Sequence, residues 1–103
     1  MSKSEHDIQN EIRLELSKQG YTVFRVNVGK VKMHDGRWFD TGLPKGFSDL
    51  MAIKNGQTSF IEVKDAKGKP SQDQILFLKR MKEQGCKAGV ARSVADALAI
   101  VTA

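Results

Sequence analysis

Three charged side chains near the middle of the chain have the types and spacing that metal-assisted hydrolysis requires. Asp49 begins one expected strand, and Glu62 and Lys64 stand two apart in the next. Residues two apart in a strand project to the same face, so Glu62 and Lys64 point together, while Ile61 and Val63 point to the opposite, apolar face. Buried charge is costly unless it is paired or bound to a metal. The three residues therefore predict a half-buried cation site.

Two carboxylates with open positions around them suit Mg²⁺ or Mn²⁺. The backbone carbonyl of Val63 could add a third oxygen ligand. Lys64 would then stand beside a metal-bound water, which it could activate or orient, or it could balance charge on a phosphodiester. All of this requires that the two strands pair with Asp49 beside Glu62. The alternative is a salt bridge near the sheet edge, since an acid two residues before a lysine is a common pattern.

The first helix is expected to follow an N-cap at Ser4 and to run to about Gln19. Apolar residues recur every four positions along it and form one stripe. Glu5 lies on the same face as this stripe and is the acid most suited to point inward. An ordinary first-turn acid, favoured by the helix dipole, explains Glu5 equally well.

A strand over residues 21–28 and a basic hairpin over 29–40 follow, with Asp35-Gly36 as the type I′ turn of the hairpin. Trp38 in this hairpin could contact nucleic acid. The interpretation that we favour is that it covers the edge of the core or a subunit interface. We expect no catalytic role for His34, because a lone histidine in a turn rarely has one.

Two strands joined by a turn at residues 54–57 lead to a polar loop at 65–70 and a helix from Ser71 to about Gln84. The apolar positions of this helix are Ile75, Leu78 and Met81. A strand at 86–91 and a helix at 94–101 complete the chain. The order α-β-β-β-β-α-β-α predicts one α/β domain over residues 1–103, with a central mixed β-sheet and helices on both of its faces.

Composition limits the partners and the compartment. The 103 residues carry a formal net charge of +5, with a pI near 9.5, which is compatible with nucleic acid as a partner. There is no apolar run long enough for a membrane span and no signal peptide. A single cysteine, Cys86, excludes an internal disulfide. We expect a cytoplasmic protein of a bacterial or phage-infected cell, with no small-molecule substrate.

These motifs, taken in order, resemble the PD-(D/E)XK nuclease superfamily and, more closely, its VRR-NUC (virus-type replication-repair nuclease) family. One departure is Ser48, where proline is commoner. The resemblance covers nearly the whole chain and rests on Glu5 with Ile8-Gln9, Arg25-x-Asn27-x-Gly29, Gly46–Leu50, Ile61–Lys64, Gly68–Ser71 with Gln74, Gly85, Val90–Val94 and Asp96–Leu98.

The resemblance implies a restriction-endonuclease-like core and a metal-dependent DNA endonuclease. Asp49 and Glu62 would be ligands of Mg²⁺ or Mn²⁺, and Lys64 the catalytic lysine. Glu5 would be an additional acid near the metal, directly or through water, and Gln74 a supporting polar residue. Small stand-alone members of the family occur in phages and resemble nucleases that act on branched DNA, such as four-way (Holliday) junctions.

The chain has no helix-turn-helix or zinc finger, which favours recognition of DNA shape over sequence. Two opposed cuts in a junction would require a two-fold homodimer, for which Trp38 and Phe39 are the interface candidates. Two alternatives stay open. One is a DNA-binding module of the same fold without catalysis, and the other is a restriction-type nuclease that cuts linear duplex.

Overall fold

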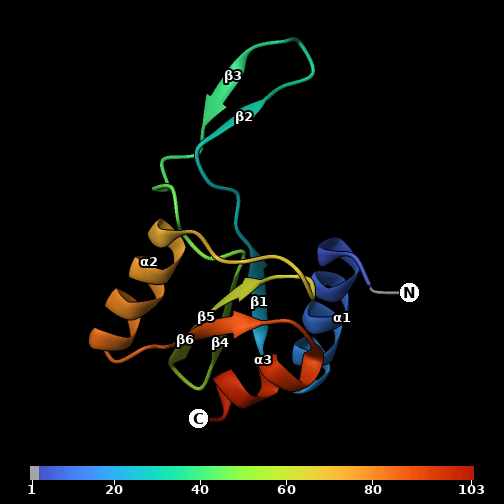
Figure 1. Ribbon diagram of the computed structural model, residues 1–103, viewed down its shortest axis with the longest axis vertical. Coiled ribbons are helices and arrows are strands. Elements are labelled where there is room, and N and C mark those ends of the chain that lie inside the picture. The colour runs from blue at the N-terminus through green and yellow to red at the C-terminus, as the bar shows by residue number, and fades with distance from the viewer. Residues whose placement is uncertain (1–2) are drawn as a thin grey trace.

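The computed structural model describes residues 3–103. Strands β1, β4, β5 and β6 form a mixed sheet in that order, in which only the β5–β6 pair is parallel. Helices cover both faces of this sheet, with α1 and α3 on one side and α2 on the other (Figure 1). The predicted α/β class is confirmed, although five strands rather than four precede α2. The elements are α1 (Glu5–Lys18), β1 (Thr22–Arg25), β2 (Lys30–Lys32), β3 (Trp38–Asp40), β4 (Leu50–Lys54), β5 (Gln57–Val63), α2 (Gln72–Glu83), β6 (Lys87–Ala91) and α3 (Val94–Val101).

The larger core cluster lies between the sheet and the helices α1 and α3. Ser4 caps α1 by accepting a hydrogen bond from the backbone N–H of Asp7. The predicted stripe of Ile8, Ile12 and Leu16 is buried in this cluster. Within residues 3–103, no helix combines the length and apolar character needed to cross a membrane.

Strand β5 is covered on both faces, which differs from the half-buried strand expected from its alternation. Ile61 and Val63 pack toward α1 and α3, and Phe60 packs toward α2. Glu62 lies on the same face of the sheet as Phe60, the face that α2 covers, and Glu62 is only 1% exposed. The carboxylate is therefore in a drier place than a one-sided sheet would provide.

A tight turn sets the register between β4 and β5. Asn55 and Gly56 both have positive φ, 52° and 77°, as a type I′ turn requires. The register that follows pairs Leu50 with Ile61. The next pair outward in this register is Asp49 and Glu62, so the arrangement required by the sequence interpretation is present.

Helix α2 begins with a full capping box, in which the Ser71 side chain accepts from the Gln74 N–H and the Gln74 side chain accepts from the Ser71 N–H. The face toward the sheet carries Gln74, Phe77, Leu78 and Met81, at helical spacing. The prediction that Ile75 lies on the buried stripe is wrong, because Ile75 is 53% exposed. Gln74 takes the sheet-facing position in the first turn, and Ile75 is consequently rotated away.

The β2–β3 hairpin, residues 30–40, projects away from the sheet, and we call it the arm (Figure 1). It leaves the sheet early, since β1 ends at Arg25 rather than at residue 28. The predicted type I′ turn is wrong, because only Gly36 of the Asp35-Gly36 pair has positive φ. The Gly36 N–H donates to the Met33 carbonyl, which leaves a three-residue loop. Asp35 instead accepts from the backbone and the guanidinium of Arg37.

Candidate active site

Asp49 and Glu62 meet at the open end of the β4–β5 pair. The carboxylate of Asp49 accepts a hydrogen bond of 2.8 Å from the backbone N–H of Val63, the residue after Glu62, and the neighbouring Asp49 is one of the causes that raise the pKa of Glu62. The N–H and C=O groups of one residue point to the same edge of a strand, so the Val63 carbonyl also faces the side of Asp49. Two side chains and one carbonyl are thus directed toward one place.

Gln74 orients one oxygen of Glu62 through a hydrogen bond. Its Nε2 donates to Glu62 Oε1 over 3.1 Å, while its Oε1 accepts from the backbone N–H of Ser71 over 2.8 Å. Both ends of the Gln74 amide therefore make hydrogen bonds. The capping box of α2 thus fixes the orientation of Gln74 toward Glu62 and also stabilises the start of the helix. The second oxygen of Glu62, Oε2, is buried and has no hydrogen-bond partner among the described residues.

Lys64 continues the line of Glu62 just beyond the end of β5. Its Nζ lies 4.0 Å from Glu62 Oε1, and its side chain is only 14% exposed. The aliphatic part of Lys64 packs over Gly68, where an added Cβ would stand 3.4 Å from Lys64 Cδ. The loop after β5 therefore supports the Lys64 side chain and keeps its ammonium group beside the Glu62 carboxylate.

The electrostatics of the pair favour a cation. Burial of its charge and the neighbouring Asp49 raise the pKa of Glu62 to about 9, against the opposing effect of Lys64. With no cation bound, the pair thus retains a proton at neutral pH. The buried Oε2 of Glu62, which has no partner among the described residues, fits a divalent metal that takes the place of this proton.

Glu5 stands farther from this centre than the two strand carboxylates. It lines an open hollow of about 400 Å³ together with Gln9, Arg25 and Asp49, and its charge contributes the smallest of the effects that raise the pKa of Glu62. Across residues 3–103, no three Asp, Glu, His or Cys side chains gather into one metal-binding group. The structure therefore brings Asp49 and Glu62 together and leaves Glu5 at the rim.

Sequence reasoning gave no role to Gln9 and Arg25, which share this hollow. Gln9 is 8% exposed, which is unusual for an amide on a surface helix. Both residues belong to the motifs that carried the family resemblance. Their position within the motifs was the signal that could have marked them.

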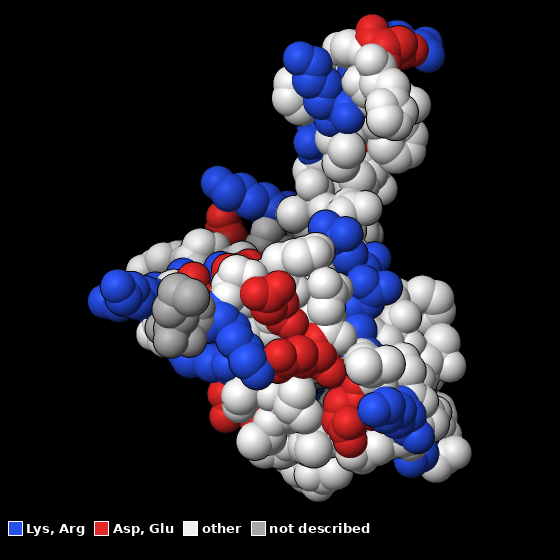
Figure 2. All heavy atoms as spheres, turned by 90° about the vertical axis from the view of Figure 1, so that its right-hand side faces the viewer, with Lys and Arg blue, Asp and Glu red and all other residues white. Residues whose placement is uncertain are grey.

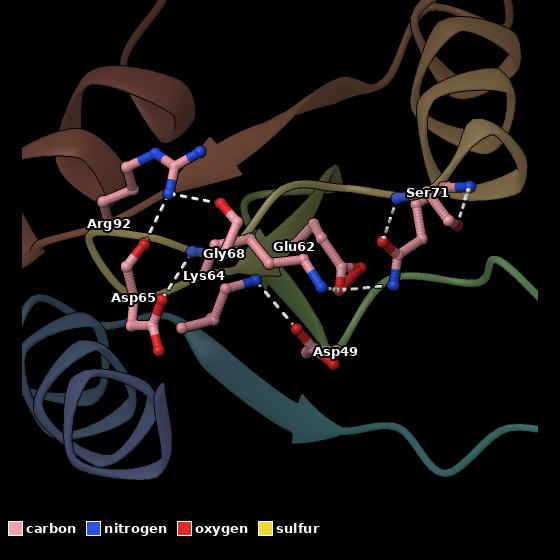
Figure 3. A network of polar contacts seen from close by, with 9 residues as sticks. Asp49, Glu62, Lys64, Asp65, Gly68, Ser71 and Arg92 are labelled. Atoms are coloured by element: carbon pink, nitrogen blue, oxygen red, sulfur yellow. Dashed lines mark hydrogen bonds and ion pairs between the residues drawn. The ribbon is translucent and has the colours of Figure 1, made fainter. Parts of the chain in front are cut away.

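A second omission is Arg92, which comes directly after β6. Its Nη1 donates to the Gly68 carbonyl over 2.7 Å and also to the Asp65 carbonyl. Asp65 in turn accepts from the N–H groups of Lys67 and Gly68, and these bonds hold the pKa of Asp65 below its usual range. Arg92 and Asp65 together fasten the loop on which Lys64 rests (Figure 3). No local pattern indicated this contact, because it joins residues 24 and 27 positions apart.

Comparison with known proteins agrees with this fold. The family model for the VRR-NUC domain matches residues 3–95. A solved structure described as a VRR_NUC domain superposes with a TM-score of 0.69 at 20% identity, covering 97% of both chains. The Holliday junction resolvase Hjc of Archaeoglobus fulgidus superposes with a TM-score of 0.57 at 24% identity, covering 84% of this chain and 65% of that one. Among curated proteins there is no match.

The fold is the mixed α/β fold of these two solved structures. The chain belongs to the VRR-NUC family.

Proposed function

We propose that the chain is a Mg²⁺- or Mn²⁺-dependent endonuclease that hydrolyses phosphodiester bonds in branched DNA. One observation carries the proposal: the buried Glu62 is oriented through one oxygen by Gln74, while its other oxygen has no partner in residues 3–103, and Asp49 is the next carboxylate in the strand register. A carboxylate arranged in this way suits a bound metal ion better than a structural salt bridge. The salt-bridge partner would be Lys64, whose Nζ lies 4.0 Å from Oε1 and leaves Oε2 without a partner in the described part of the chain.

The residues of the site would divide the work as follows. Asp49, Glu62 and the Val63 carbonyl would hold the metal, and Glu5 would reach it through water. A bound divalent cation supplies an activated water and polarises a phosphate oxygen. Lys64 would stabilise the negative charge that develops on the phosphate. Gln74 would keep Glu62 in the orientation that holds the metal.

The choice of branched DNA is supported by two features. The site opens into a hollow of about 400 Å³, which is too small to enclose a duplex. The relative Hjc is described as a Holliday junction resolvase. A four-way junction is therefore the first substrate to test.

Two opposed cuts in such a junction would need two copies of the chain related by a two-fold axis. The arm offers an exposed apolar face with Val31, Met33 and Phe39, on which a second copy could pack. Light scattering should show a dimer at micromolar concentration. A monomer across this range would contradict this assembly without affecting the chemistry of the site.

The decisive experiment compares the wild-type protein with Lys64→Ala on four-way, flap, splayed and linear DNA, each with Mg²⁺, Mn²⁺ or EDTA. We expect cleavage of branched DNA in metal alone and a loss of about 10²–10³-fold in Lys64→Ala. Lys67→Ala is the matched control, because Lys67 is exposed and has no side-chain contact with the carboxylates. If wild-type protein binds DNA but cuts no form in either metal, the chain is a binding module. Preferential cleavage of linear duplex would instead indicate a restriction-type nuclease.

A further inference from the structure

The arm presents two chemically different faces, which the strand register separates. Residues directly opposite each other in an antiparallel pair share a face. Lys32 pairs with Trp38, and Lys30 pairs with Asp40, so these four side chains lie on one face. Trp38 is 65% exposed, which excludes the interpretation that it covers the edge of the core.

The other face is apolar. Val31 pairs with Phe39, and Met33 follows Val31 two residues on. These three side chains line one surface hollow on the arm, to which Lys32 and His34 also contribute. Trp38 and Phe39, adjacent in sequence and predicted together as one interface, therefore point to opposite sides.

The lysines on the face that carries Trp38 are free to bind an outside partner. No carboxylate within residues 3–103 lies within 4.0 Å of the ammonium group of Lys30 or Lys32. Asp40, on the same face, turns its Oδ1 to the backbone N–H of Gly42. Arg37 at the tip differs, because it is paired with Asp35 at 2.7 Å.

The arm begins at the rim of the candidate active site. Residues 26–28 line the hollow that contains Asp49, and the chain enters β2 two residues later. The neck is closed by the Thr41 N–H, which donates to the Gly29 carbonyl over 2.8 Å. From Gly29 to the tip, the strand rise of roughly 3.3 Å per residue gives a reach of about 20 Å. Figure 2 shows Lys and Arg side chains on the arm and along its approach to the body.

We propose that the face with Lys30, Lys32 and Trp38 is a DNA-binding surface distinct from the catalytic centre. The lysines contact phosphates, and Trp38 stacks on an unpaired base beside a branch point. Duplex bases have both faces covered by their neighbours, so an exposed indole on a projecting arm selects bases that a branch leaves unstacked. The surface rests on the proposed function, which supplies DNA as the partner.

Charge favours DNA over a second copy of the chain on this face. A two-fold interface places the same patch on both partners. The patch carries Lys30 and Lys32 against a single carboxylate, Asp40, so each copy would present the same net positive charge to the other, which opposes association. A polyanion instead gains from both ammonium groups.

The chain contains a single tryptophan, so its fluorescence reports on Trp38 alone. We expect a four-way or splayed DNA in EDTA to quench this fluorescence strongly, and a linear duplex to quench it weakly. Trp38→Ala should weaken binding of branched DNA about fivefold or more, as the loss of one stacked base predicts, and should leave linear duplex binding unchanged. The variant Lys30→Gln/Lys32→Gln should lower the salt-dependence slope for both DNA forms by about 1.8, the value for two phosphate contacts.

Arg37→Gln is the matched control, because it removes a positive charge of the arm that is already paired. Unchanged branched-DNA affinity in Trp38→Ala overturns the inference even if the wild-type protein cuts DNA, in which case the proposed function stands. A concentration-dependent blue shift of the fluorescence without DNA, and no quenching with DNA, would assign the face to a second copy. Normal DNA binding through the arm with no cleavage in metal would support the surface and reject the nuclease.

Discussion

The raised pKa of Glu62 makes the stability of the metal-free protein depend on pH in a direction that one substitution can test. The pKa of Glu62 is about 9 in the fold, against 4.5 for an unperturbed glutamate. The folded state therefore binds one more proton than the unfolded chain between these values. The associated stability is fully present below pH 4.5 and is lost as the pH rises through 9.

The magnitude follows from one proton. In metal-free buffer, the free energy of unfolding should fall by about 1.4 kcal/mol per pH unit, or about 2.6 kcal/mol between pH 6 and pH 8. Asp65, whose pKa is lowered, adds no slope between pH 6 and pH 8, because its contribution is constant there and is lost only as the pH falls below the ordinary range of the group. Glu62→Gln keeps the shape of the side chain and removes the titration, so it should lose this slope.

The assay is urea unfolding in EDTA at a series of pH values, for the wild type, Glu62→Gln and the control Glu83→Gln. Glu83 is an exposed glutamate at the end of α2, so its substitution changes the net charge equally and should leave the slope intact. Saturating Mn²⁺ should raise the melting temperature of the wild type more at pH 8 than at pH 6, because the proton and the metal compete for Glu62. Equal pH slopes in the wild type and Glu62→Gln would refute this account of the buried pair.

Two further predictions concern the supports of the site. Arg92→Ala should speed amide exchange at Lys67 and Gly68 and reduce kcat about tenfold with a smaller change in KM, since the loop under Lys64 loosens; unchanged exchange would show that the loop holds itself. Gly46→Ala should lower the free energy of unfolding by at least about 2 kcal/mol, because the φ of 96° is strained for alanine and the new Cβ would lie 2.7 Å from the Asp73 backbone. Gly42→Ala, at a φ of 80° with nothing within 4 Å, isolates the strain alone and should cost less.

The sequence predicted the centre of the site because its determinants are local. The period of two in β5 placed Glu62 and Lys64 on one face, and the turn at Asn55-Gly56 fixed the register that brings Asp49 beside them. The same signal failed at Asp35-Gly36, where the aspartate side chain binds the Arg37 N–H and guanidinium. An Asn-Gly and an Asp-Gly pair therefore produced two different turns, and the bonds between Asp35 and Arg37 set the second turn apart.

The surroundings of the site could not be predicted because they depend on how whole elements are placed. The rotation of α2 is set by Gln74, which turns toward the sheet to meet Glu62 and leaves Ile75 exposed. Arg92 reaches its loop across the fold rather than along the chain. The division of the arm into two faces follows from the register of β2 and β3, which the misassigned turn would have shifted.

Asp49 has a structural part in addition to its proposed role as a metal ligand, and this decides which variants can test the chemistry. Strand β4 begins one residue after Asp49. In a longer strand a backbone carbonyl would accept the hydrogen bond of the Val63 N–H, but here the Asp49 carboxylate accepts it. Asp49→Ala would leave that buried N–H unpaired, at a cost of about 1–3 kcal/mol, and lost cleavage would then confound stability with catalysis. Lys64 makes no such bond with its side chain. The lysine is for this reason the sharper probe of the reaction, and Asp49→Asn, which retains an acceptor oxygen for Val63, is the sharper probe of the metal.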